Sequence, residues 1–334
     1  MSFTREPDYL RLLGVLALAA TLATVASLFV GYVHIDVLAA AVDGLRGRVT
    51  LPELALIELR VPRAILGATI GFTLGVAGAA MQGLLRNPLA DPGVVGVSGG
   101  AAFGAVVAFY SGFSGAFALA LPIGGVAGAL VSAVALYALA GRGAGTMTLI
   151  LAGVTINALA GALTSLALNL SPNPYAVFEI MFWLMGSLQD RSLPQVALAL
   201  PLMAIGWALI LTRARALDAL TLGEDTAASL GFDLIGLRWS LIAGAALSVG
   251  AAVAVSGAIG FVGLVAPHLM RPWVGYRPGR LIAASGFAGA ILLVAADVLV
   301  RVLPTHPEFK LGVVTSLIGA PFLLALVNRS RERG

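Results

Sequence analysis

Long apolar stretches without a charged residue recur through most of this 334-residue chain. A helix needs about 20 mostly apolar residues to cross the hydrocarbon core of a bilayer, where every backbone polar group must be bonded within the protein. Charged residues make up only 11% of the chain, whereas soluble globular proteins contain roughly 25%. The sequence therefore predicts an all-α polytopic membrane protein.

The charge-free stretches map the expected spans. They lie at residues 12–33, 64–85, 92–141, 143–178, 192–212, 239–270, 281–296 and 311–328. The third is long enough for two helices with a turn near residues 111–115, and Gly257, Gly260 and Gly263 divide the stretch 239–270 into two. We therefore expect about ten transmembrane helices in a single transmembrane domain over residues 1–334.

Lys and Arg residues predict the orientation of these spans. With ten spans, most of them fall on the side of the two termini, so both termini are expected in the cytoplasm. Arg46, Arg48, Arg60 and Arg63 run against this rule, because they cluster on the outer side before the second span. An alternative reading of the first stretch is a signal peptide, although its apolar run exceeds the roughly 7–15 residues of such segments.

Several functional classes are excluded by missing residue types. The chain has no cysteine, which removes disulfides, thiolate metal sites and cysteine nucleophiles, and we expect no metal site. Its net charge of +4 is dispersed, so nucleic acid is not an expected partner. The single lysine, Lys310, is followed by Leu311, so the chain has no P-loop for ATP.

A G-x-S-x-G pattern at Gly96–Gly100 would indicate a serine hydrolase if it stood between a strand and a helix. Here it follows a proline-containing turn and leads into an apolar helix, so we expect no catalytic residues. Gly67, Gly71 and Gly75 recur at four-residue spacing, which is typical of helices that pack closely in membranes. We interpret that stripe as a packing surface.

The polar interruptions between spans carry the remaining functional signal. Arg86–Gly93 contains two prolines and predicts a rigid connector at the inner membrane face. The longest inner loop, about residues 213–238, places Glu224 and Asp225 early and Gly231 late, a pattern that predicts a short helix. A short helix at the cytoplasmic face suggests a docking partner, and the alternative is a solvated loop.

Taken in order, these motifs resemble the FecCD-type permeases of bacterial ABC importers, over nearly the whole chain. The motifs that carry the resemblance are Arg60–Arg63 (RVPR), Gln82 with Arg86–Ser98 (RNPLADPGVVGVS), Leu222–Glu224 to Leu230–Gly231, Gly257–Arg271 (GAIGFVGLVAPHLMR), Asp297–Arg301 (DVLVR) and Gly312–Pro321 (GVVTSLIGAP). The resemblance implies a type II importer permease fold with ten helices, working as a homodimer in the bacterial inner membrane. It also implies a periplasmic binding protein and two separate ATPase subunits, which would hold ATP and magnesium, so no cofactor is expected in this chain.

The resemblance assigns three groups of site residues. The ATPase-coupling group is Leu222, Gly223, Glu224, Asp225, Ala228, Leu230 and Gly231. Arg60, Arg63 and Arg301 match the outer arginines that pair with carboxylates of the binding protein, which would explain the positive charges that violate the topology rule. Asn87, Leu89, Thr146 and Met147 match the inner gate of the translocation path.

The family carries iron siderophores, haem or cobalamin. The stretch Leu151–Gly161 resembles haem permeases more than cobalamin permeases, so haem is the expected cargo. His268 belongs to the general family pattern and does not by itself indicate haem. An ion-coupled secondary transporter is the alternative class, but it would need ionisable residues in its spans, where Asp297 and His268 stand nearly alone. An intramembrane enzyme would need an acid, a base and a nucleophile together, which the sequence does not offer.

Overall fold

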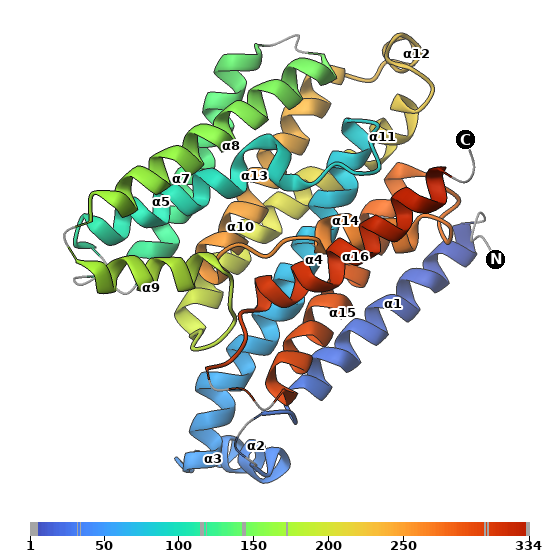
Figure 1. Ribbon diagram of the computed structural model, residues 1–334. Helices are drawn as coiled ribbons and strands as arrows, with labels where there is room; N and C mark the ends of the chain where they lie inside the picture. Colours follow the sequence, from blue (N-terminus) through green and yellow to red (C-terminus); the bar gives the residue numbers. More distant parts are fainter. Residues whose placement is uncertain are drawn as a thin grey trace.

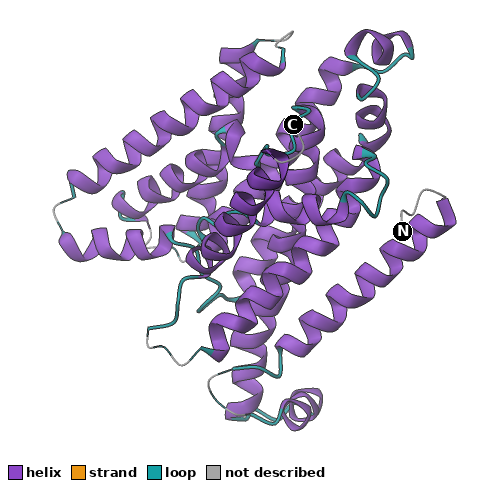
Figure 2. Cartoon of the chain, turned by 45° about the vertical axis from the view of Figure 1, so that its right-hand side comes forward, coloured by secondary structure: helices purple, strands orange, loops and turns teal. Residues whose placement is uncertain are grey.

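The computed structural model describes residues 6–31, 33, 35–113, 117, 119–141, 145–171, 173–303, 305 and 307–331, with side chains 94, 95 and 325–331 left aside. Over these residues the chain forms helices and loops and no strand (Figure 2). The prediction of an all-α fold is confirmed.

Among the described residues, seven helices are long and apolar enough to cross a membrane. They are α1 (Glu6–Ser27), α7 (Ala120–Ala140), α8 (Thr146–Asn169), α10 (Leu193–Leu211), α13 (Leu234–Ser256), α15 (Pro278–Val302), and a continuous helix made of α3 (Leu51–Leu54), the π-helical η1 (Ala55–Arg60) and α4 (Val61–Leu84). Shorter apolar helices are α5 (Val97–Tyr110), α9 (Pro174–Leu184), α14 (Val262–Met270) and α16 (Leu311–Arg331). Each of the ten predicted spans contains a helix, so the expected number agrees roughly with the structure.

The short elements lie between the spans. They are α2 (Val37–Leu45), the 3-10 helix η2 (Pro92–Val95), α11 (Ala214–Leu220) and α12 (Glu224–Ser229). Figure 1 shows α2 and α3 at one end of the bundle and α12 at the other, with both chain ends on the side of α12. We call these the α2 end and the α12 end.

Helix boundaries follow local chemistry. The break expected among Gly257, Gly260 and Gly263 is present, because α13 stops before Gly257, whose φ is +72°. The stretch 143–178, expected as one span, instead holds α8 and a separate α9. The side chain of Asn173 accepts a hydrogen bond from Tyr175 N and Pro174 occupies the first turn, so a new helix begins there.

The glycine stripe of α4 packs directly on the backbone of α15, which lies beside it (Figure 1). A Cβ atom at Gly71 would overlap the carbonyl oxygen of Gly289, and one at Gly75 would overlap that of Ser285. The interpretation of this stripe as a packing surface is confirmed. The pair α4 and α15 therefore forms the closely packed centre of the bundle.

Candidate transport sites at the two ends of the bundle

The predicted coupling segment forms a short helix, α12, bracketed by two glycines in unusual conformations. Gly223 has a φ of +109° and Gly231 a φ of +86°, values that L-amino acids rarely adopt. A side chain at Gly231 would meet nothing within 4 Å, so the backbone conformation and not space requires glycine there. The expected helix with a glycine stop is confirmed.

One face of α12 holds it to the bundle and the other is open. Glu224 Oε2 accepts a hydrogen bond from Arg238 Nη2 at 2.7 Å, and Ala227 is fully buried. Leu222 and Leu230 are 64% and 59% exposed, and Asp225 and Ala228 are exposed between them. The structure thus separates Glu224, which anchors the segment, from the residues that are free to meet a partner.

Helix α11 precedes α12, contacts it and connects it to the bundle. Asp218 Oδ1 accepts a hydrogen bond from Gly279 N, the second residue of α15, at 2.8 Å. Leu217 is fully buried and lies against Gly83 at the end of α4. These contacts fix α11, and through it the predicted coupling segment, to both central helices. Asp218 was not predicted from the sequence. The one local signal for its partner is the Pro278-Gly279 pair, which marks the start of α15, where backbone N–H groups need acceptors.

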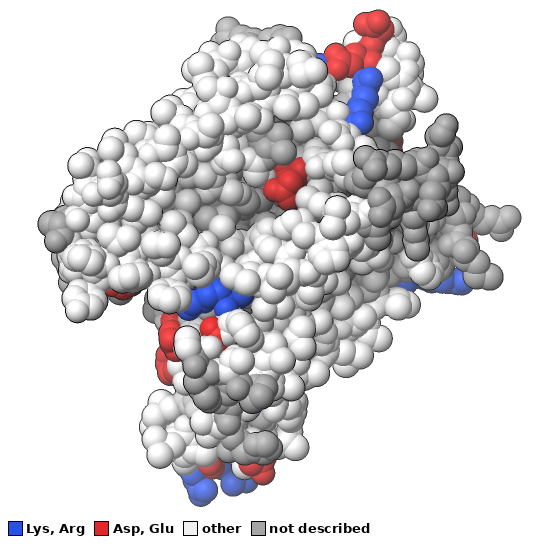
Figure 3. All heavy atoms as spheres, in the orientation of Figure 1, with Lys and Arg blue, Asp and Glu red and all other residues white. Residues whose placement is uncertain are grey.

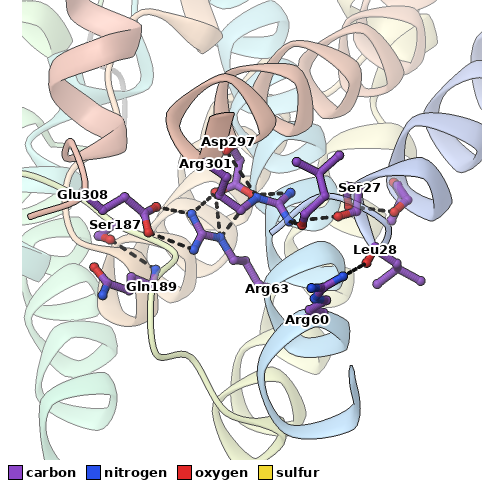
Figure 4. Close-up of polar contacts among 11 residues, drawn as sticks. Ser27, Leu28, Arg60, Arg63, Ser187, Gln189, Asp297, Arg301 and Glu308 are labelled. Carbon is purple, nitrogen blue, oxygen red and sulfur yellow. Dashed lines mark hydrogen bonds and ion pairs between the residues drawn. The ribbon is translucent and has the colours of Figure 1, made fainter. Parts of the chain in front are cut away.

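At the α2 end, the predicted docking arginines belong to a buried network of ion pairs (Figure 4). Arg63 Nε donates to Asp297 Oδ1 at 2.9 Å, and the guanidinium of Arg63 also pairs with Glu308. Arg301 Nη2 lies 2.9 Å from Asp297 Oδ2. The side chains of Arg63 and Arg301 are only 12% and 5% exposed. Glu308 was not anticipated, although it precedes the last span in an outer loop.

The remaining donors of these arginines hold the segment that follows α1. Arg301 Nη1 donates to the carbonyl oxygens of Ser27 and Val30 at 2.8 and 2.7 Å. Arg60 Nη1 donates to the carbonyl oxygen of Leu28 at 2.7 Å. These internal bonds give a second reason for positive charges at this end, and docking of a binding protein stays a prediction. Charge reversal at Arg63 or Arg301 would break the network and would not test docking cleanly.

The predicted gate residues occupy two separate elements. Asn87 Oδ1 accepts a hydrogen bond from Leu89 N at 2.9 Å, and Leu89 is 47% exposed in the connector after α4. Thr146 opens α8, and Met147 beside it is 69% exposed. The contacts found in the described part of the chain do not join the two pairs, so the gate stays a prediction.

Two distant motifs of the resemblance meet beside this connector. Arg271 Nη2 donates to Gln82 Oε1 at 2.6 Å, and Gln82 Nε2 faces the carbonyl oxygen of Gly263 at 3.5 Å. Gln82 is buried near the end of α4. Arg271 thus supplies a donor for the buried amide oxygen of Gln82. This bond gives a structural reason for the presence of both residues in the motifs.

An apolar cavity of about 630 Å³ lies between α9, α16 and the loop after α13. Its walls contain no charged side chain and are formed by Leu184, Met185, Ala258, Gly260, Gly312, Val313, Ser316, Leu317, Ala320, Pro321 and Leu324. In Figure 3 most of the visible face carries no charge: charged side chains lie at its upper and lower ends, a basic patch with acidic side chains beside it lies between them on the left, and an acidic side chain lies in a hollow above the centre. Such walls suit passage without tight binding.

His268 offers no metal centre among the residues described. Its ring stands edge-on to Phe322 at a centroid distance of 5.4 Å. Groups of three or more potential metal ligands are absent from the described residues. The histidine is therefore a packed side chain at the end of α14.

Comparison with known proteins decides the family. The sequence pattern of the FecCD transport family matches residues 17–329. The chain belongs to the FecCD transport family. This FecCD protein is a multi-pass permease subunit of a type II ABC importer and not an enzyme; ATP hydrolysis belongs to a separate subunit. Membership also excludes the secondary transporter and the intramembrane enzyme.

Relatives of this FecCD permease are named for different cargos. It is 41% identical over 287 residues to the cobalamin import system permease protein BtuC of Halobacterium salinarum, covering 84% of this chain and 76% of the relative. It is 38% identical over 281 residues to the hemin transport system permease protein HmuU of Yersinia pestis, covering 83% and 84%. A solved metal-chelate type ABC transporter in an inward-facing conformation matches with a TM-score of 0.83 and 29% identity, over 96% of this chain and 99% of that one.

Proposed function

We propose that two copies of this permease form the translocation path of a haem importer in the bacterial inner membrane. A periplasmic binding protein would deliver cargo at the α2 end, and two ATPase subunits would dock at the α12 end, in the cytoplasm with both chain termini. The observation that carries this proposal is α12, a short helix paired to Arg238 through Glu224 and flanked by the exposed Leu222 and Leu230, in a chain without a P-loop.

The proposed dimer has a source of buried surface in α8 and α16. Both helices expose large apolar side chains, including Leu151 at 60%, Leu159 at 59%, Leu317 at 69% and Leu324 at 66%. Only 22% of the residues in the most apolar 18-residue stretch of α8 are buried within one chain. A second copy would cover part of this surface and enclose the cavity beside α16. The mass of the intact complex, measured by native mass spectrometry from detergent, tests the dimer.

Haem is supported by the Leu151–Gly161 stretch and by the hemin permease among the relatives. Cobalamin is the second candidate cargo, because a cobalamin permease is 41% identical. The decisive experiment reconstitutes the permease with its ATPase and binding protein in nanodiscs. We expect the haem-loaded binding protein to stimulate ATP hydrolysis several-fold more than the same protein offered cobalamin or a ferric siderophore. Stimulation by cobalamin alone would overturn haem and keep the importer class, whereas uptake without the ATPase would overturn the proposed energy source.

A prediction about α12 follows from its exposed leucines. The double substitution Leu222→Asp and Leu230→Asp should weaken binding of the ATPase subunit at least tenfold, because each buried leucine contributes about 1.5–3 kcal/mol. Transport should fall in parallel while the permease still elutes as a single species in detergent. Binding is measured by titration of the labelled ATPase onto the permease in nanodiscs.

The matched control for this pair is Tyr276→Asp. It replaces a 69% exposed side chain with a carboxylate at the same end of the bundle, outside α12. It should leave ATPase binding within about twofold. Equal weakening by both variants would show that added charge, and not loss of the α12 contact, explains the effect.

A further inference from the structure

Helix α2 is held firmly on one side. Its N-cap Asp36 accepts hydrogen bonds from Leu38 N at 3.1 Å and Ala39 N at 3.0 Å. Val37 and Ala40 are 7% and 1% exposed and form a small apolar cluster with Leu56 of η1. This cluster is separate from the main core, and it fixes α2 against the outward extension of α4.

The opposite face of α2 is apolar and has no partner within the described chain. Leu38, Val42 and Leu45 are 70%, 41% and 89% exposed, and their spacing of four and three residues places them on one face. Arg46 and Arg48 follow directly and are exposed. Arg48 makes only a long ion pair of 4.0 Å with Asp43 and keeps 66% of its side chain exposed.

This apolar face continues the lipid-facing surface of α1. The exposed stripe of α1 comprises Leu10, Val15, Leu18, Leu22 and Val25, each between 47% and 65% exposed. Only 17% of the residues in the most apolar 18-residue stretch of this helix are buried in the bundle. Phe29 and Val33, 54% and 69% exposed, carry the stripe from the end of α1 toward α2. The exposed apolar surface of α1 thus extends through Phe29 and Val33 toward α2, and the exposed N-cap Asp36 lies before the apolar face of α2 begins.

The distance of α2 beyond the end of α1 matches the thickness of the headgroup layer. Arg60 bonds to the carbonyl oxygen of Leu28, just after the last residue of α1, and marks the level at which α1 leaves the bundle. Leu56, on which α2 packs, lies four residues farther out on the same continuous helix. This part is π-helical, so its rise per residue is below the 1.5 Å of an α-helix and the offset is less than about 6 Å. The headgroup layer on each side of the hydrocarbon core is roughly 5–7 Å thick. Figure 1 shows α2 past the end of α1. Taking the end of α1 as the edge of the hydrocarbon core, this offset places α2 at headgroup depth.

We propose that α2 is an interfacial anchor that lies on the lipid leaflet at its end of the bundle. Leu38, Val42 and Leu45 insert at the boundary between headgroups and acyl chains, and Arg46 and Arg48 pair with lipid phosphates. Guanidinium groups match phosphate oxygens in charge and geometry, and short helices with an apolar face and flanking basic residues bind such interfaces. Because α2 packs on η1, this anchor also positions the Arg60 segment relative to the membrane. The proposal is independent of the cargo.

The absence of cysteine makes a direct depth measurement possible. Single cysteines at Leu38, Val42 and Leu45 carry a spin label in the full-length permease, reconstituted without partners in vesicles of phosphatidylcholine and phosphatidylglycerol. Collision with oxygen, which prefers lipid, is compared with collision with a water-soluble nickel chelate. Leu18→Cys on α1 gives the value for lipid, and Asp225→Cys on α12 gives the value for water.

The three α2 labels should fall between the two references, because the boundary between headgroups and acyl chains lies between the lipid around Leu18 and water. Nickel collisions should be far rarer than at Asp225, and oxygen collisions should dominate less strongly than at Leu18. Nickel collisions as frequent as at Asp225 would overturn the proposal. Protection from nickel that arises only when the binding protein is added would overturn it as well, because the face would then be a protein docking surface. The labelled positions are exposed, so each variant should elute as the unlabelled permease does.

A second measurement tests the phosphate contacts. In the double variant Arg46→Gln and Arg48→Gln, the Val42 label should lie shallower and should lose its dependence on phosphatidylglycerol content. Retention of that dependence in the double variant, or its absence in the unaltered permease, would overturn the assignment of these arginines to lipid phosphates.

Discussion

Gly75→Ala is expected to destabilise the permease by at least about 3 kcal/mol and to lower its yield sharply, although the change adds one methyl group. The new Cβ would overlap the carbonyl oxygen of Ser285 on α15. Two helix backbones would have to separate, which costs more than the roughly 1–3 kcal/mol of ordinary overpacking by flexible side chains. Thermal unfolding in detergent and the fraction of monodisperse protein measure the effect.

The same substitution at Gly67, two repeats earlier in the glycine stripe, provides the control. A Cβ at Gly67 would lie 3.4 Å from Leu188 Cδ1, an ordinary van der Waals contact. Gly67→Ala should therefore be neutral or stabilising by up to about 1 kcal/mol, since alanine favours the helix. Similar destabilisation by both variants would show that the stripe acts through its composition and not through the contact of α4 with α15.

Asp297→Ala is expected to cost about 3–5 kcal/mol, because it leaves two buried guanidinium groups, Arg63 and Arg301, facing each other with Glu308 as the remaining carboxylate. Asp297 is 3% exposed, so water cannot replace the lost oxygens without opening the network. The unfolding temperature in detergent should fall accordingly. We also expect proteolysis to increase in the segment after α1, because Arg301 holds it through Ser27 and Val30.

A surface ion pair serves as the comparison for Asp297. Asp43 lies 4.0 Å from the largely exposed Arg48. Asp43→Ala should change stability by less than about 1 kcal/mol, as exposed pairs contribute little. Equal effects at the two aspartates would mean that the network at the α2 end is solvated and contributes no more than a surface pair.

One helix connects the two ends of the permease. The second residue of α15, Gly279, bonds to Asp218 beneath the coupling segment, and its last turns carry Asp297 and Arg301. Along its length, α15 contacts the glycine stripe of α4. The residues expected to meet the ATPase and those expected near the binding protein are therefore attached to the same closely packed pair of helices.

The local features of this fold were predictable from the sequence. The spans follow from apolar stretches of about 20 residues, and α12 follows from two acidic residues before a late glycine. The break after α13 follows from its glycines. Each signal depends on neighbours along the chain, because hydropathy, capping and backbone conformation act over a few residues. Division of the stretch 143–178 at Asn173 was missed, since the capping signal lay inside a charge-free run.

The sequence by itself determined a membrane-spanning helical protein without a P-loop, because charged residues are scarce and the single lysine lies outside any such motif. The importer permease and its separate ATPase were indicated by the resemblance of its motifs to the FecCD family. Only the tertiary structure decided which charges are internal. Arg63 meets Asp297 across 234 residues and Glu308 across 245, and Asp218 meets Gly279 across 61. No local pattern encodes such partners, because they are brought together only when α4 and α15 pack through their glycines. The same packing leaves exposed the leucines of α2 and those that flank α12, the surfaces that we propose for lipid and for the ATPase.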